Sequence, residues 1–193
     1  MIVVGTAYLA LAVGAVPAIL GVLTWALYIG VYTPMKTRTE WNTTVGAIAG
    51  ALPMLMGYTA AGGSLWDVEG WLLFGVLLLW QYPHFMAIAW MYRYDYGAAG
   101  LKMTPVVEPT GRRAGWQAIV GSLLLVATLV ALVMMGNWGW LLAIAAVAVT
   151  AKFVVASFQF AKQPDDITAR HLLRASILQL PAAMIVLVIS ALV

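Results

Sequence analysis

Long apolar runs separated by short polar stretches dominate this chain of 193 residues. Only 9% of the residues are charged, whereas soluble domains carry about 25% charged residues. About 20 consecutive apolar residues suffice for a helix to cross the hydrocarbon core of a bilayer. The runs therefore predict a polytopic, all-α transmembrane bundle with six full spans, at roughly residues 17–32, 43–61, 70–91, 116–136, 138–158 and 172–193.

The first apolar stretch, residues 1–32, is too long for one span, because a helix of this length would measure about 48 Å. Gly14 is the expected break, with Pro17 opening the next helix. Residues 1–13 would then form only about 20 Å of helix, too short to cross. We expect a partial first helix completed by a longer natural protein or by a partner. A short re-entrant or interfacial start is the alternative.

The charges predict how the bundle lies in the membrane. All ten Lys and Arg residues fall in loops 33–42, 92–115 and 159–171 or in the helix ends beside them. The loops between these carry Asp67 and Glu69 instead. The positive-inside rule places the three basic loops on the cytoplasmic side of a bacterial-type cytoplasmic membrane. Short basic loops between spans do not indicate nucleic-acid binding. The absence of cysteine excludes thiolate metal sites.

The stretch from Trp80 to Val107 passes from an apolar span into a polar cluster, and it contains His84 and Asp95. If the helix continues through it, these two side chains point the same way, about 16 Å apart along the axis. Ionisable residues at membrane depth mark functional sites by default. His84 could be a haem-iron ligand or a proton carrier. The alternative is a core histidine that is hydrogen-bonded to a neighbouring helix.

Two basic loops could together bind a diphosphate. The first contributes Lys36 and Arg38, and the second contributes Arg93 and Lys102. Asp95 beside them could hold Mg²⁺, which favours one or two carboxylates plus phosphate oxygens and water. The alternative is that the cations only determine topology, and that Asp95 pairs with Arg93 or caps a helix.

A second acidic pair, Asp165 and Asp166, follows Pro164 and precedes an apolar run. Acidic residues at a helix N-terminus complement the helix dipole. We therefore predict a helix start there and not a paired-carboxylate site.

Three stretches, residues 31–61, 79–107 and 175–181, resemble the protoheme IX farnesyltransferases (haem O synthases) of the UbiA prenyltransferase superfamily. The resemblance implies a UbiA-like membrane bundle. That family has nine spans, and this chain matches the last part of the third through the ninth. Residues 1–193 would thus be one transmembrane prenyltransferase domain without its first two spans and part of the third.

The resemblance also implies a reaction. The family transfers the farnesyl group of farnesyl diphosphate to a vinyl group of haem B, with Mg²⁺ assisting departure of diphosphate. Partners would be both substrates, the lipid bilayer, and haem A synthase or terminal oxidase assembly factors. Tyr92 and Tyr96 would line the mouth of the site and shield the allylic cation. The remaining implied roles are diphosphate or haem-propionate binding by Lys36, Arg38, Arg93 and Lys102, catalysis by Asp95 and Tyr92, a metal ligand in Asp95, and haem contact by His84.

Two departures from the superfamily pattern matter. The chain has no Asn-xxx-Asp-xxx-Asp motif, so we expect it to be inactive alone. Met91 and Ala99 stand four residues either side of Asp95, where aromatic prenyltransferases usually have a second acid. Thr37 replaces a cation frequent in haem O synthases, and Arg38 could substitute for it. The alternatives are an aromatic prenyltransferase and a non-catalytic haem- or lipid-binding subunit.

Overall fold

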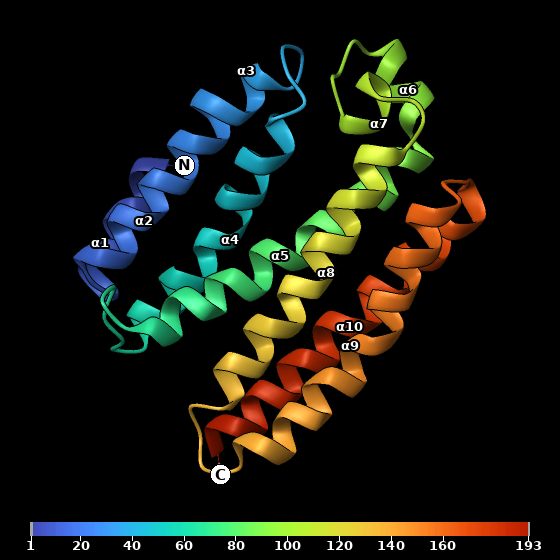
Figure 1. The fold of residues 1–193 in the computed structure, drawn as a ribbon. Coiled ribbons are helices and arrows are strands. Elements are labelled where there is room, and N and C mark those ends of the chain that lie inside the picture. Colours follow the sequence, from blue (N-terminus) through green and yellow to red (C-terminus); the bar gives the residue numbers. More distant parts are fainter. Residues whose placement is uncertain (1, 193) are drawn as a thin grey trace. The chain divides into compact units, whose positions relative to one another are not determined.

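The computed structural model describes residues 2–192, which form helices joined by short loops (Figure 1). No strand occurs within this described range, which confirms the predicted all-α class. The chain divides into two compact units, Met1–Leu78 and Leu79–Val193, and the division falls inside helix α5. Each unit has its own helix packing and is described separately.

The first unit begins with α1 (Ile2–Ala12) and α2 (Ala15–Ala26). Gly14 separates them with φ 148°, a conformation that favours glycine, so the predicted break is confirmed. The second helix continues through a π-helical segment, η1 (Leu27–Tyr32), into α3 (Thr33–Met35). Pro34 in α3 lacks a backbone N–H, and the Thr33 hydroxyl donates to the Tyr28 carbonyl at 2.8 Å within the widened turn.

Helix α4 (Asn42–Ala60) packs against α2, and α1 packs against α2. Leu20, Leu52 and Leu55 are buried at the core of this unit. The loop after α4 is closed by Asp67, whose carboxylate accepts from the Ser64 N–H at 2.7 Å and from the Tyr58 hydroxyl at 3.0 Å. The first unit is thus a small helical layer that carries the first basic loop at one end.

The second unit contains the end of α5 (Val68–Met91) and five further helices, and its α9 packs lengthwise against both α8 and α10 (Figure 1). A Cβ added to Gly115 on α8 would lie 2.6 Å from the Cα of Ala161 on α9, so small residues permit this close approach. Phe153 and Phe160 of α9 are fully buried in the core. The five are α6 (Arg93–Ala98), α7 (Thr104–Val107), α8 (Arg112–Val133), α9 (Gly139–Lys162) and α10 (Asp166–Leu192).

Five helical stretches in the described residues are long and apolar enough to cross a membrane. They are Ala15–Met35, Val68–Met91, Arg112–Val133, Gly139–Lys162 and Asp166–Leu192. Helix α4, with 19 residues, corresponds to the span predicted at residues 43–61, but it is not among these five stretches. Large apolar side chains such as Ile144, Val155 and Ile185 are exposed on these helices, as expected for a surface that faces lipid.

Candidate functional site

The half-buried imidazole of His84 lies where α5 meets α10. Its ring stacks on that of Trp80, one turn earlier, with centroids 4.5 Å apart and planes 20° apart. His84 Nδ1 is 2.8 Å from the Ser176 hydroxyl of α10, and Trp80 Nε1 donates to the Ser176 carbonyl at 3.0 Å. One residue of α10 therefore positions both aromatic rings.

The hydrogen-bond network around Ser176 assigns the proton on His84. The Ser176 hydroxyl has one proton and donates it to the Leu173 carbonyl at 2.6 Å. The same oxygen then accepts from His84, so Nδ1 carries the imidazole proton and Nε2 keeps its lone pair. An imidazole oriented in this way can ligate a metal or accept a proton through Nε2. The core-histidine alternative accounts for the Nδ1 bond, whereas Nε2 has no hydrogen-bond partner among residues 2–192.

The helix that carries His84 ends at Met91, so the predicted continuous stripe from His84 to Asp95 is wrong. Tyr92 departs from helical geometry with φ −105° and ψ 20°, and α6 then starts anew at Arg93. The Arg93 side chain explains this end, because its Nη1 donates to the Trp90 carbonyl at 2.7 Å. A basic side chain that bonds a late carbonyl in this way is a helix C-terminal cap.

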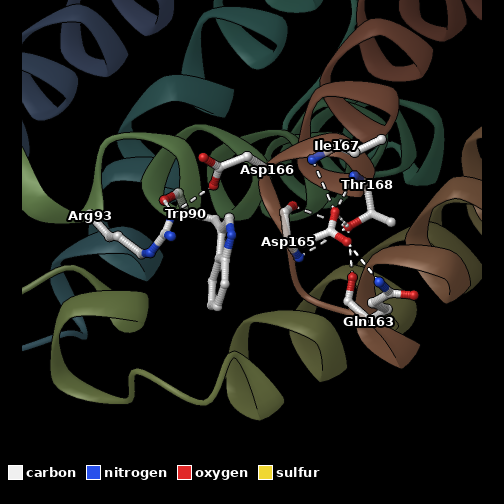
Figure 2. Close-up of polar contacts among 7 residues, drawn as sticks. All are labelled: Trp90, Arg93, Gln163, Asp165, Asp166, Ile167 and Thr168. Carbon is white, nitrogen blue, oxygen red and sulfur yellow. Dashed lines mark hydrogen bonds and ion pairs between the residues drawn. The ribbon is translucent and has the colours of Figure 1, made fainter.

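Arg93 is held by aromatic and acidic neighbours (Figure 2). Its Nη1 lies 2.8 Å from Asp166 Oδ1, and its guanidinium lies 4.6 Å from the Trp90 ring and 4.5 Å from the Tyr94 ring. Burial acts to lower the pKa of Arg93, but its hydrogen bonds and charge interactions with Asp166 and Tyr94 together outweigh burial, and the pKa is raised. The Arg93 side chain pairs with Asp166 and not with Asp95. The alternative in which Asp95 pairs with Arg93 is therefore wrong.

Asp165 and Asp166 start α10, as the sequence predicts. Figure 2 shows the Asp165 carboxylate receiving the backbone N–H groups of Ile167 at 2.9 Å and Thr168 at 2.8 Å. Its pKa is lowered, first by the bond from the Thr168 N–H and further by the Thr168 hydroxyl. The pair thus caps one helix and ties its N-terminus to α6.

The exposed Asp95 carboxylate has no hydrogen bond or ion pair within residues 2–192. Nor does any cluster of three or more His, Cys, Asp or Glu in this range have the spacing to hold a metal ion. Mg²⁺ needs only one or two protein carboxylates when phosphate oxygens and water complete its coordination, so the metal role of Asp95 stays a prediction. Nearby, the Tyr92 and Tyr96 rings lie 6.3 Å apart, and Lys102 is exposed on the loop that follows.

The first basic loop belongs to the other unit. Lys36 Nζ lies over the Tyr32 ring at 4.4 Å and 5.8 Å from the Tyr28 ring centre, a cation–π arrangement at the end of the π-helical segment. Arg38 is exposed two residues later. Convergence of Lys36 and Arg38 with the cations of the second loop stays a prediction.

Two supports of the site were not predicted from the sequence. Ser176 lies in the 175–181 stretch. A hydroxyl within an apolar span is a signal for a polar contact with a neighbouring helix. No sequence pattern marks Gly111, which has φ 77° and where an added Cβ would lie 2.6 Å from both the Trp90 ring and Pro164. Glu108 beside it accepts from the Arg113 and Thr110 N–H groups and from the Thr110 hydroxyl. Burial acts to raise the pKa of Glu108, but these bonds outweigh it and the pKa is lowered.

The profile of the UbiA prenyltransferase family matches residues 1–180. The protoheme IX farnesyltransferase of Rhodopirellula baltica is 52% identical over 98% of this chain and 68% of its own length. That of Solibacter usitatus is 40% identical over 93% of this chain and 61% of its length. The human mitochondrial protoheme IX farnesyltransferase is 36% identical over 95% of this chain and 41% of its own length. No solved structure matches the chain.

The chain spans between 41% and 68% of the length of these relatives, while they cover nearly all of it. The matched region contains both basic loops, the His84 helix and the start of α10. The match also includes, of the three stretches that carry the resemblance, all of residues 31–61 and 79–107 and most of residues 175–181. The chain belongs to the UbiA prenyltransferase family.

Proposed function

We propose that the protein to which this sequence belongs makes haem O from haem B and farnesyl diphosphate. A bond forms between C1 of the farnesyl group and one vinyl carbon of the haem, and the C1–oxygen bond to diphosphate breaks. Water adds its hydroxyl to the other vinyl carbon and releases a proton. The observation that carries the proposal is His84, held through Nδ1 with Nε2 available. The names of the relatives support it.

His84 would contact the haem. The bond from Nδ1 to Ser176 fixes the plane of the imidazole, and a fixed ring with a free Nε2 suits an axial bond to iron. Stacking on Trp80 further limits rotation of the ring. In this arrangement His84 orients the porphyrin, and the reacting vinyl group lies at its edge.

Cations would bind the diphosphate or the haem propionates. Lys36, Arg38 and Lys102 would approach these anions from the basic loops, while Arg93 would share its charge with Asp166. Mg²⁺, held by substrate oxygens and one carboxylate, would neutralise charge on the leaving diphosphate. Asp95 is the carboxylate that fits, because it is exposed and has no partner among residues 2–192.

Haem binding tests the proposal without depending on turnover. The chain is reconstituted in lipid nanodiscs and titrated with haem B while the Soret band is recorded. We expect saturable binding, loss of it by at least tenfold in His84→Ala, and unchanged binding in the matched control His171→Ala. Equal binding by both variants, or none by the parent, would contradict the role of His84.

Acceptor choice separates this activity from that of an aromatic prenyltransferase. Membranes that contain the protein are supplied with farnesyl diphosphate and with either haem B or 4-hydroxybenzoate. We expect prenylated haem and no prenylated benzoate. Farnesylation of the benzoate alone would favour the aromatic alternative, and binding of haem without any transfer would favour a non-catalytic subunit.

The Mg²⁺ role of Asp95 has its own test. If its carboxylate helps to hold the ion, Asp95→Ala should raise the Mg²⁺ concentration needed for half-maximal transfer. The same turnover at the same Mg²⁺ requirement would remove Asp95 from the metal site. Residence in a bacterial cytoplasmic membrane, and contact with haem A synthase or oxidase assembly factors, belong to the same proposal.

A further inference from the structure

A groove between α9 and α10 combines cations with small apolar side chains, and both helices are long and apolar enough to cross a membrane. It encloses about 450 Å³ and takes residues from matching faces of both helices, at spacings of three and four. Ala156 and Ala175 are buried in the groove wall, and their small side chains leave room for an occupant. At the deep end, a hydrogen bond of 3.2 Å from Gln179 Nε2 to the Thr150 hydroxyl joins the two helices.

Two cations line this groove, and both stand farther inside their helices than the helix-end position expected from the sequence. Lys152 stands ten residues before the end of α9, about 15 Å along the axis, and Arg174 stands eight residues into α10, about 12 Å. His171 and Gln159 line the groove toward the loop end. Charged side chains at such depth are costly unless an opposite charge or water compensates them. Neither Lys152 nor Arg174 has a hydrogen bond or ion pair within residues 2–192.

Three acidic residues of the same unit are already engaged elsewhere. Asp165 receives two backbone N–H groups as the cap of α10, and Asp166 pairs with Arg93. Glu108 caps α8 through the Arg113 and Thr110 N–H groups. No acidic residue lines the groove. The compensating anion therefore does not come from the side chains that line the groove, and a ligand from outside the chain can supply it.

We propose that this groove binds the phosphate headgroup of an anionic phospholipid. The groove lies on helices that span the membrane, beside exposed apolar side chains such as Val155 and Leu178, along which an acyl chain can lie. Arg174 and His171 would donate to the phosphate, and Lys152 would extend toward it along the groove. Basic pockets between membrane helices bind anionic headgroups in this manner. The site is independent of His84 and of the proposed transfer reaction.

Native mass spectrometry of the detergent-purified protein tests this inference. Phosphatidylglycerol and phosphatidylcholine are added separately, and retained lipid is counted. The groove variant is Lys152→Gln with Arg174→Gln. The matched control, Lys162→Gln with Arg170→Gln, removes the same charge from the same two helices outside the groove. We expect the parent and the control to retain phosphatidylglycerol at least fivefold more than phosphatidylcholine, and the groove variant to lose this preference.

Two further measurements keep the outcome decisive. The charge-preserving variant Lys152→Arg with Arg174→Lys should retain the lipid, which separates charge from folding. Inorganic phosphate at millimolar concentration should not displace it, because the acyl chains add apolar contact. Equal loss in the groove and control variants, no preference in the parent, or full displacement by inorganic phosphate would each overturn the proposal.

Discussion

At the residue scale, single polar side chains cap the helices of this protein and join them to one another. The position of Asp165 and Asp166 at a helix start was predictable from the sequence. An acidic pair that follows a proline and precedes an apolar run is typical of a helix N-terminus. The partner of His84 was not, since Ser176 is 92 positions away and nothing local indicates which helix faces which. Sequence patterns thus identified the titratable side chains, whereas their protonation and partners depend on tertiary contacts.

The tautomer of His84 is directly testable, because the chain has only two histidines. With ¹⁵N-labelled histidine, we expect the His84 ring to show a protonated Nδ1 and an unprotonated Nε2. Ser176→Ala removes the acceptor, so the ring should become a mixture of tautomers. Haem affinity should fall roughly 10–100-fold, as for other losses of a group that orients a ligand. His171→Gln assigns the signals, and an unchanged His84 spectrum in Ser176→Ala would contradict the network.

The cap at Asp165 predicts a pH dependence of stability. Its pKa is below the ordinary 3.8 in the folded protein. Its contribution is therefore complete above the unfolded pKa and is lost as pH falls through the lower folded value. Asp165→Ala should lower the melting temperature at neutral pH, and the difference from the parent should shrink below about pH 4. Thermal melts between pH 7 and pH 3 measure this, and a difference that stays constant with pH would refute it.

At the element scale, the positions where helices end were harder to predict from the sequence than the helices themselves. The break at Gly14 was predicted from length and composition. The end of α5 at Met91 was not, because the residues from Tyr92 to Tyr96 have no glycine or proline to signal it. The Arg93 side chain ends that helix by bonding back to the Trp90 carbonyl, and a tertiary contact with Asp166 holds it there.

Gly111 tests how the end of α5 is supported. Its φ of 77° disfavours alanine by roughly 1–2 kcal/mol, and the added Cβ would also meet Trp90 and Pro164. Gly100 is the matched control, with φ 70° and nothing within 4 Å of an added Cβ. We expect Gly100→Ala to cost only the backbone strain and Gly111→Ala to cost roughly 1–3 kcal/mol more. Unfolding in detergent mixtures measures both free energies, and equal costs would contradict the packing role.

At the scale of the whole molecule, composition predicted the class well. Few charges and long apolar runs are sufficient to indicate a helical membrane protein. The number of spans was less certain, because α4 includes Asn42 and three threonines and falls outside the five clear candidates. The stretches that carry the family resemblance, such as the one around His84, are short relative to the whole chain.

The cysteine-free sequence makes membrane orientation simple to measure. Single cysteines at Thr37 and Ala99 lie on the basic loops, and those at Trp66 and Trp138 lie on the opposite ones. A membrane-impermeant maleimide should label the second pair in intact cells, and the first pair only in inverted vesicles. Labelling of all four positions from one side would contradict the predicted orientation.

The bond between His84 and Ser176 has a consequence for biogenesis. A ribosome adding about 5–20 residues per second needs roughly 5–20 s to make the 92 residues between them. During that interval the histidine has entered the bilayer without its partner, and its ring can rotate. A defined orientation of this imidazole is therefore acquired only after α10 has been made and has inserted. A nascent chain that stalls earlier would be threaded into the membrane and yet be unable to present the imidazole in a defined direction.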